Sequence, residues 1–147
     1  MITPVVKVRR LRTSATIPAR HSDEAAGFDL AADIGAAIVL APMERAAIAT
    51  GIALEIPAGF EGQVRPRSGR ALKEGLALVN SPGTIDADYR GEVMVIAINL
   101  GVEPIRIERG DRIAQLIIAP VVHALIVEAD DLSVSGRGDG GFGHSGR

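Results

Sequence analysis

The chain has 147 residues and a formal net charge of −2, so it fits one domain with a sizeable core and has no diffuse basic field for nucleic acid or a membrane surface. It has three Phe, one Tyr and no Trp, which leaves few rings for stacking single-stranded nucleic acid. The lack of cysteine excludes disulfides, and no apolar run approaches the roughly 18 residues of a membrane span. We therefore expect a cytoplasmic protein that binds neither nucleic acid nor membrane.

Short runs of β-forming residues recur along the chain, with Gly, Pro, Asp or Asn between them. They predict strands at Val5–Leu11, Ala37–Leu40, Ala46–Ala49, Ile52–Ile56, Gly62–Arg65, Leu76–Val79, Glu92–Asn99, Ile105–Glu108, Ile113–Ile118 and Val122–Glu128. No helical period is long enough for alternating strands and helices. The pattern therefore predicts an all-β sandwich, jelly roll or small barrel.

Two local patterns add detail to this prediction. The run Glu92–Asn99 is apolar on both of its faces, which indicates a strand covered from two sides, the second cover being a candidate subunit contact. Only Ser68–Glu74 predicts a helical turn, with Ser68 as its cap and Gly75 ending it. We expect the chain to leave the body of the domain at Pro120.

The last fifteen residues, SVSGRGDGGFGHSGR, hold six glycines around Arg137 and Phe142. Such a segment cannot pack a core, because glycine loses the most backbone entropy on ordering. Its free amides and its guanidinium suit a phosphate, and its phenyl ring suits a flat ligand. We expect one domain over residues 1–132 and a flexible arm over residues 133–147, which is either a lid over a phosphorylated ligand or a terminus without a role.

Polar islands interrupt the predicted strands. Asp29, in AAGFDLAAD, is either a turn residue at a strand end or a ligand group. Arg67, Ser68 and Gly69, in RPRSGRA, form either a plain helix cap or an anion site of amides, a hydroxyl and a guanidinium. Gln115, in GDRIAQLII, is a lone amide in an apolar strand and offers either a strand hydrogen bond or a ligand contact.

A further island, NSPGTIDADYRGEV at residues 80–93, predicts a hairpin that projects side chains, with turn chemistry at Pro82 and Gly83. Asp86 and Asp88 lie there beside the only tyrosine, Tyr89. Two carboxylates at this point either solvate a loop or supply a general base next to a flat surface.

Taken in chain order, the segments AGFDLAA, PRSGRA, GTIDADYRGEV, GDRIAQLII and RGDGGFG resemble the five motifs of the homotrimeric deoxyuridine triphosphatases, the dUTPases. The resemblance spans residues 25–146. It implies a jelly-roll-like β-sandwich subunit with a glycine-rich C-terminal arm, and a homotrimer whose active sites draw on all three chains. It implies hydrolysis of dUTP to dUMP and pyrophosphate with Mg²⁺, which removes dUTP from the nucleotide pool and supplies dUMP for thymidylate synthesis.

The resemblance also implies a role for each matching residue. Asp86 would deprotonate the water that attacks the α-phosphorus, and Asp29 would reach Mg²⁺ through water. The uracil and deoxyribose would be bound by Asn80, Gly83, Thr84, Ile85, Tyr89, Met94 and Phe142. The phosphates would be bound by Arg67, Ser68, Gly69, Gln115, Arg137, Gly141, Gly143 and Ser145.

Two positions depart from the family pattern, and two rival functions remain open. Arg70 stands where an apolar residue is usual, and His144 stands where a small hydroxyl residue is common. A dCTP deaminase would share the fold and a similar hairpin, but would place a catalytic glutamate near it. A non-catalytic nucleotide-binding or regulatory relative is the other alternative, although the presence of Asp86 favours the hydrolase.

Overall fold

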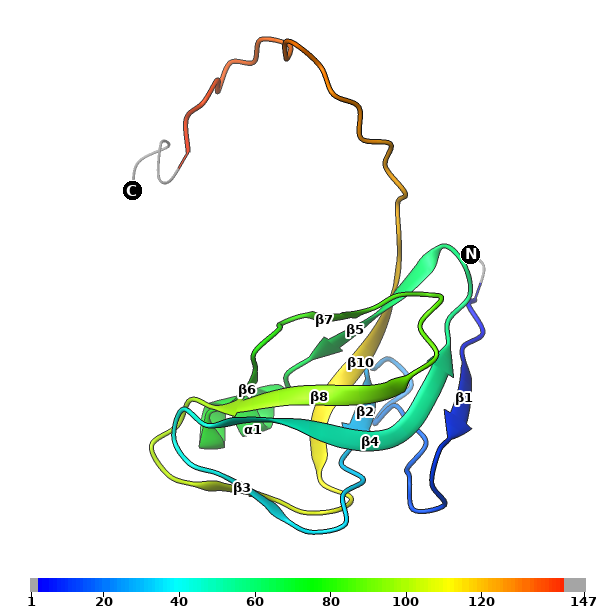
Figure 1. Ribbon diagram of the computed structural model, residues 1–147, viewed down its shortest axis with the longest axis vertical. Helices are drawn as coiled ribbons and strands as arrows, with labels where there is room; N and C mark the ends of the chain where they lie inside the picture. Colours follow the sequence, from blue (N-terminus) through cyan, green and yellow to red (C-terminus); the bar gives the residue numbers. More distant parts are fainter. Residues whose placement is uncertain (1–2, 142–147) are drawn as a thin grey trace.

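The computed structural model describes residues 3–141 and is built almost entirely of strands (Figure 1). The elements are β1 (Lys7–Arg10), β2 (Phe28–Ala31), β3 (Ile38–Leu40), β4 (Arg45–Glu55), β5 (Phe60–Arg65), α1 (Ser68–Glu74), β6 (Leu76–Leu78), β7 (Gly83–Ile85), β8 (Glu92–Asn99), β9 (Ile105–Ile107) and β10 (Arg112–Pro120). All the paired strands are antiparallel. The all-β prediction is confirmed.

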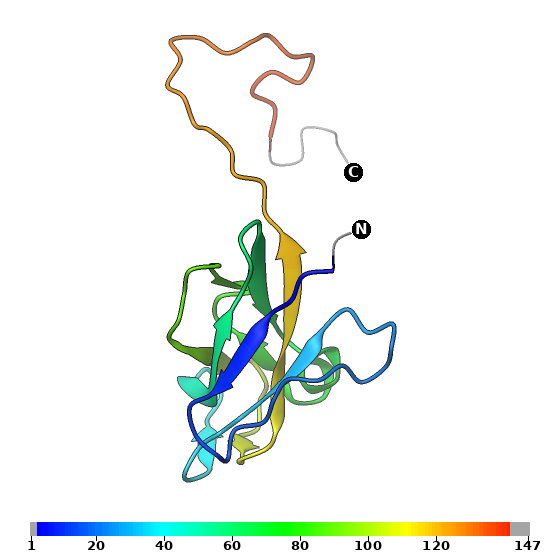
Figure 2. The ribbon, with the colours of Figure 1, turned by 90° about the vertical axis from the view of Figure 1, so that its right-hand side faces the viewer.

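Two four-stranded sheets form the body of the domain. The first has the order β1-β4-β8-β6, the second has the order β2-β10-β5-β7, and β3 with β9 adds a separate two-stranded ribbon. The two sheets pack face to face as a sandwich, visible edge-on in Figure 2. The core between them holds fully buried residues from both sheets, such as Ile48 and Val95 from the first and Leu30 and Ala114 from the second.

Strand β8 has the bounds that the sequence predicts, and its two faces meet different surroundings. Val93, Val95 and Ala97 are buried in the core. Met94 and Ile96, on the opposite face, are 40% and 37% exposed. Among the described residues, the second apolar face of β8 is therefore only partly covered, which leaves apolar surface for a subunit contact.

Four expectations about the elements need correction. The predicted runs 46–49 and 52–56 belong to one long strand, β4, with an irregularity in its pairing to β8 around Gly51. The short strands β2 and β7 lie where the sequence indicated turns. Ser68 does not cap α1, because the cap position belongs to Arg67, which makes no side-chain capping bond. Gly75, in the left-handed conformation, does end the helix.

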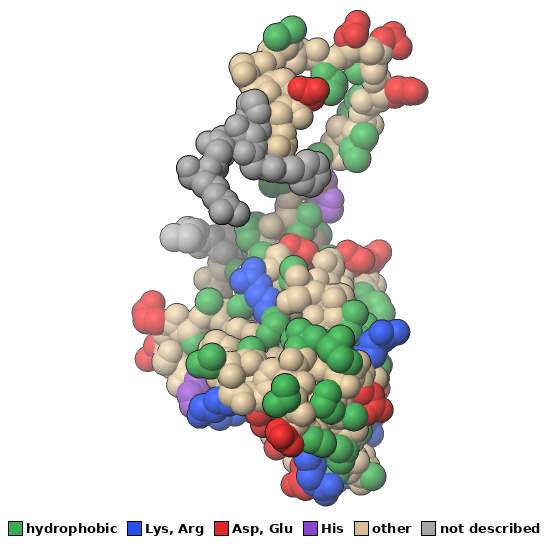
Figure 3. Space-filling model, turned by 90° about the vertical axis from the view of Figure 1, so that its left-hand side faces the viewer, with side chains coloured by type: hydrophobic (Ala, Val, Ile, Leu, Met, Phe, Trp, Pro, Cys, Tyr) green, Lys and Arg blue, Asp and Glu red, His purple; other side chains and the backbone are tan. Residues whose placement is uncertain are grey.

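The predicted strand Val122–Glu128 is wrong for the single chain. Residues beyond Pro120 form no strand within the described range, and their large apolar side chains from Val122 onward are exposed, with Val122 at 90% and Ile126 at 93%. Residues 121–141, which continue into the predicted arm 133–147 and are called the arm from here on, extend away from the body (Figures 1 and 3). A β-forming sequence needs a partner strand, and the arm has none within residues 3–141. In that same range, no helix has the length and apolar character needed to cross a membrane.

Candidate active site

A polar hollow of about 260 Å³ lies where β2, β10 and the start of α1 meet. It is lined by His21, Ala25, Ala26, Gly27, Asp29, Arg67, Ser68, Gly69 and Gln115. Five predicted site residues from three separate motifs thus lie together, namely Asp29, Arg67, Ser68, Gly69 and Gln115. We call this the phosphate hollow, after the ligand that its residues were predicted to bind.

Strand pairing explains why these residues meet. Strand β10 lies between β2 and β5, so Gln115 stands opposite Asp29 on one side and Arg65 on the other. The Gln115 side chain donates a hydrogen bond through Nε2 to the Pro66 carbonyl at 2.9 Å, which holds the amide beside the start of α1. A Cβ on Gly27 would lie 2.5 Å from Gln115 Oε1, so glycine leaves the amide the space it occupies.

Two arginines hold Asp29. Its carboxylate is 2.9 Å from Arg67 Nε and 3.1 Å from Arg112 Nη1. Arg112 Nη1 also lies 3.3 Å from Nδ1 of His21. Two guanidiniums around one carboxylate leave excess positive charge at the hollow, which favours an anionic ligand.

Arg112 and His21 were missed by the sequence reasoning. Arg112 carried a signal, because it lies within GDRIAQLII only three residues before Gln115. His21 carried no signal beyond its residue type. Arg70, one of the two departures, forms an ion pair with Glu74 on the same helix and lies 3.8 Å from Asp111.

A second hollow of about 430 Å³ adjoins the first and reaches the segment of residues 80–93. It is lined by Arg65, Pro66, Ser68, Ser81, Pro82 and Gln115. Ser68 and Gln115 line both hollows. The start of the 80–93 segment therefore lies beside the phosphate hollow.

The 80–93 segment is not a hairpin, contrary to the sequence prediction. Strand β7 pairs with β5, whereas β8 pairs with β4 and β6, so the segment crosses from one sheet to the other. Strand β7, formed by Gly83, Thr84 and Ile85, is the last strand of its sheet, and one backbone edge has no strand partner in the described chain. A Cβ on Gly83 would lie 3.0 Å from Nδ2 of Asn80, so the Asn80 side chain lies over the start of this strand.

The β7–β8 turn, residues 86–91, presents Asp86, Asp88 and Tyr89. The turn is closed by a hydrogen bond from the Tyr89 amide to the Asp86 carbonyl at 3.1 Å. Both carboxylates are exposed, and Tyr89 is 45% exposed. An exposed carboxylate at the end of a free strand edge is placed to act as a base on a bound ligand or water.

Other predicted residues lie apart from both hollows in the single chain. Asp86 and Tyr89 line neither hollow, and Met94 lies on the outward face of β8. Arg137 lies in the exposed arm, where its Nε donates to the Gly140 carbonyl at 2.6 Å, and Gly141 follows it. Phe142, Gly143, Ser145 and the departure His144 lie outside the described residues. One chain therefore presents its predicted site residues in separate groups.

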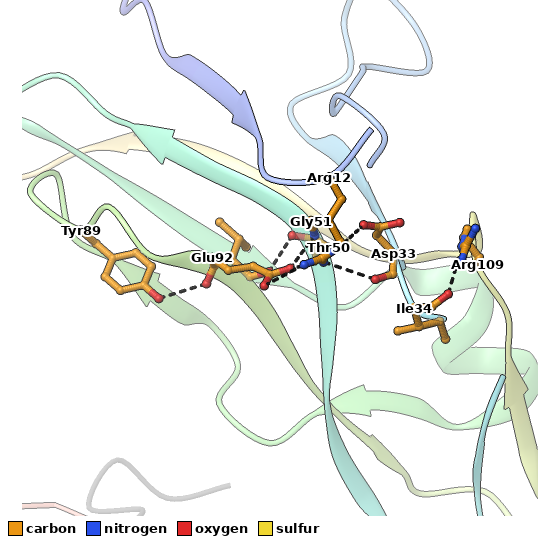
Figure 4. Close-up of polar contacts among 9 residues, drawn as sticks. Arg12, Asp33, Ile34, Thr50, Gly51, Tyr89, Glu92 and Arg109 are labelled. Atoms are coloured by element: carbon orange, nitrogen blue, oxygen red, sulfur yellow. Dashed lines mark hydrogen bonds and ion pairs between the residues drawn. The ribbon is translucent and has the colours of Figure 1, made fainter. Parts of the chain in front are cut away.

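A network of charged groups behind the β7–β8 turn was not predicted (Figure 4). Arg12 Nε donates to Asp33 Oδ2 at 2.7 Å, and Arg12 Nη2 donates to Glu92 Oε1 at 2.5 Å. Hydrogen bonds from the Ser14 hydroxyl and from Arg12 lower the pKa of Asp33, whose side chain is 3% exposed. The hydrogen bond from Arg12 likewise lowers the pKa of Glu92, and both carboxylates raise the pKa of Arg12.

Acidic and histidine side chains do not cluster into a metal site anywhere in residues 3–141. Asp29 is the one carboxylate that lines the phosphate hollow. Its two oxygens already face Arg67 and Arg112, so direct metal coordination would displace an arginine, whereas contact through a water would not. Mg²⁺ usually keeps several waters and binds one or two carboxylates together with substrate phosphates, which fits this arrangement.

Comparison with known proteins identifies the family. The dUTPase family model matches residues 13–146. A deoxyuridine 5'-triphosphate nucleotidohydrolase of Anaeromyxobacter sp. (strain Fw109-5) is 56% identical over 145 residues, covering 97% of each chain. One from Syntrophotalea carbinolica (strain DSM 2380 / NBRC 103641 / GraBd1) is 53% identical over 146 residues, covering 99% of each.

Solved structures agree with these matches. A mutant dUTPase of Staphylococcus bacteriophage 80alpha, determined with dUpNHpp, superposes with a TM-score of 0.89 at 31% identity, covering 99% of this chain and all of that one. The dUTPase of phage phi11 of S. aureus superposes with a TM-score of 0.80 at 27% identity, covering 87% and 97%. From its sequence, its sheet order and these matches, the chain belongs to the dUTPase family.

Proposed function

We propose that this protein hydrolyses dUTP to dUMP and pyrophosphate, and so removes dUTP from the nucleotide pool and supplies dUMP for thymidylate synthesis. Relatives that are more than half identical to it over nearly their whole length are named for this activity. The structural observation that carries the proposal is the free edge of β7, which is followed directly by the exposed carboxylate of Asp86. A free nucleotide substrate also agrees with the expected cytoplasmic location.

The free edge of β7 is the surface that binds uracil and selects it over other bases. An edge strand offers backbone N–H and C=O groups, which pair with the polar edge of a base as another strand would. Thr84 and Ile85 supply this backbone, and Asn80 adds a side-chain amide beside Gly83. The ring of Tyr89 supports the deoxyribose and leaves no room for a 2′-hydroxyl.

The phosphate hollow binds the triphosphate. Arg67 and Gln115 donate to phosphate oxygens, as do the Ser68 hydroxyl and the amides at the start of α1. Asp29 would hold Mg²⁺ through a water molecule. The chemistry that the ion would supply there is neutralisation of the charge that develops on the phosphate oxygens.

Asp86 is the general base. Its carboxylate accepts a proton from a water molecule while the oxygen of that water bonds to the α-phosphorus. The bond from the α-phosphorus to the oxygen that bridges to the β-phosphorus breaks, and pyrophosphate leaves with that oxygen. The reaction needs positioned charges and one base, and no nucleophilic side chain.

We place the complete site between chains of a homotrimer. The separate groups of predicted residues in one chain support this placement, because no single chain brings Asp86 to the phosphate hollow. The exposed apolar face of β8, with Met94 and Ile96, gives a subunit contact. The exposed apolar side chains of the arm support a docking place for it on another chain, from which Arg137 and Phe142 close over a ligand.

The test measures pyrophosphate release from dUTP, dCTP, dTTP and UTP in the presence of Mg²⁺. We expect dUTP to be preferred by about 10⁴ or more over dCTP, because a site built for specific polar groups rejects analogues that lack them. Comparable turnover of dCTP or dTTP would contradict the proposal. Release of ammonia from dCTP would instead establish the deaminase, and binding without turnover would establish the non-catalytic relative.

A further inference from the structure

Strand β4 has a bulge behind the β7–β8 turn. The pairing of β4 with β8 shifts between Ala49 and Ala53, and Gly51 there has a φ of +71°. The Gly51 amide donates to Glu92 Oε1 at 2.8 Å, and the Gly51 carbonyl accepts from the Leu11 amide at 2.7 Å. The bulge therefore joins the segment that follows β1 to the first residue of β8.

Arg12, directly after Leu11, spans this junction (Figure 4). Its guanidinium bridges two carboxylates from different parts of the chain, namely the buried Asp33 and the side chain of Glu92. A planar guanidinium is suited to such bridging because its donors are fixed in one plane. Glu92 is consequently held by Arg12 and by the Gly51 amide together.

Glu92 in turn holds Tyr89. The Tyr89 hydroxyl donates to the backbone carbonyl of Glu92 at 3.0 Å. The ring is folded over Gly91, where a Cβ would lie 2.4 Å from the hydroxyl oxygen and 2.6 Å from Cζ. Arg90 braces the same turn by donating to the Ala87 carbonyl at 2.7 Å and to the Tyr89 carbonyl at 2.9 Å.

We propose that Arg12 is a positioning residue for sugar selectivity: it fixes Glu92, whose carbonyl anchors the Tyr89 hydroxyl and so holds the ring that excludes a 2′-hydroxyl. This inference rests on the proposed function for its substrate, but its geometry does not. Within residues 3–141, the polar contacts of the Arg12 side chain go to Asp33 and Glu92, neither of which is predicted to bind ligand. Arg12 also precedes residues 13–146, which the family model matches. It acts on the site only through Glu92.

The experiment compares Arg12→Gln with Lys7→Gln as the matched control. Lys7 and Glu55 form an exposed ion pair between β1 and β4, at 2.8 Å. Each variant removes one positive charge near the N-terminus, but Lys7→Gln removes one exposed ion pair, whereas Arg12→Gln removes the pairs with both Asp33 and Glu92. The quantity measured is the ratio of kcat/KM for dUTP to kcat/KM for UTP. We expect Arg12→Gln to lower this ratio about 10-fold, which corresponds to the free energy of about one hydrogen bond. We expect Lys7→Gln to leave the ratio unchanged.

A second readout reports the ring without any substrate. Tyr89 is the only tyrosine in a chain without tryptophan, so the intrinsic fluorescence of the protein comes from this ring. We expect acrylamide to quench this fluorescence more strongly in Arg12→Gln than in Lys7→Gln or the unmodified protein. Where Arg12→Gln does not fold, Arg12→Lys carries the same test, because an ammonium cannot bridge both carboxylates as the planar fork does.

A double variant tests whether Arg12 acts on sugar selectivity through the Tyr89 hydroxyl. Tyr89→Phe removes the hydroxyl that Glu92 anchors, so adding Arg12→Gln to it should not lower the dUTP/UTP ratio further. An equal loss of kcat/KM for both nucleotides in Arg12→Gln, with unchanged quenching, would overturn the proposal and leave Arg12 a structural role. Increased quenching in a protein that does not hydrolyse dUTP would confirm the anchor and contradict the proposed function instead.

Discussion

At the scale of single residues, the two carboxylates of the β7–β8 turn give a matched pair. Asp86 and Asp88 are both exposed, and only Asp86 directly follows the free edge strand. We expect Asp86→Asn to bind substrate almost normally and to lose about 10²–10⁴ in kcat, because an amide cannot accept the proton of the attacking water. Asp88→Asn is the control and should keep most of its turnover. More than about a tenth of normal turnover in Asp86→Asn would exclude Asp86 as the base.

The charged network predicts a dependence of stability on pH. The pKa of Glu92 is lowered from its ordinary value of 4.5, chiefly by the hydrogen bond from Arg12. A lowered folded-state pKa adds stability that is fully present above the ordinary value and is lost as the pH falls through the folded-state value. Desolvation and the nearby charge of Asp33 act in the opposite direction and reduce this effect.

Glu92→Gln measures that contribution. We expect the variant to be less stable than the unmodified protein by about 1–2 kcal/mol at pH 7, since the hydrogen bond to a charged partner is weakened. This gap in the free energy of unfolding should shrink as the pH falls below about 4.5. Glu108→Gln, in an exposed ion pair with Arg106, is the control and should cost little at any pH. A gap that stays constant down to pH 3 would contradict the account.

At the scale of elements, the bulge at Gly51 shows how one glycine joins two parts of the chain. A Cβ at this position would lie 2.3 Å from Asp33 Oδ2 and 2.7 Å from the Ala15 Cβ, in addition to the strain of a φ of +71°. Gly59 has a φ of +84° with nothing within 4 Å of an added Cβ, so it isolates the strain of the backbone alone.

We therefore expect Gly51→Ala to lower the free energy of unfolding by about 3 kcal/mol and Gly59→Ala by about 1 kcal/mol. Urea titration of both variants gives the two values. Equal losses of unfolding free energy in the two variants would contradict this expectation, because they would mean that the added Cβ at position 51 does not crowd Asp33.

The sequence predicted elements well where the pattern was local. The alternation in Glu92–Asn99 gave β8 its bounds, and Gly75 marked the end of α1. The glycine at position 51 was interpreted as a break between strands, because glycine in a bulge and glycine in a turn look alike in sequence. The apolar run 122–128 predicted a strand, but whether a strand forms depends on a partner strand, and residues 3–141 of the single chain supply none.

In the candidate site, too, features set by local sequence could be predicted, and features set by contacts between distant residues could not. The residues that line the phosphate hollow could be selected from the sequence, because they lie in short motifs that resemble those of a known family, and the structure places them side by side. Their role in binding phosphate stays a prediction. The network of Arg12 was missed, since its contacts join residues 21 and 80 positions apart in sequence. Charged residues so far apart give no pattern from which their contact can be predicted.

At the scale of the whole molecule, we expect the active site of a single chain to be incomplete. The predicted base lies on the β7–β8 turn and does not line the phosphate hollow. The described part of the arm extends away from the sandwich (Figure 1). Deleting residues 135–147 should leave the oligomer intact, because that segment is too polar and glycine-rich to add core. The deletion should reduce kcat strongly, because the contacts that close the arm over the ligand would be lost.

Mixing two inactive chains tests this central claim most directly. One chain carries Asp86→Asn and the other lacks residues 135–147, and the two are refolded together and assayed for pyrophosphate release from dUTP. If the base and the arm of one site come from different chains, the mixed oligomers should regain part of the activity that neither parent has. Mixed oligomers no more active than their parents, or a monomer by light scattering, would show that the site is not shared between chains.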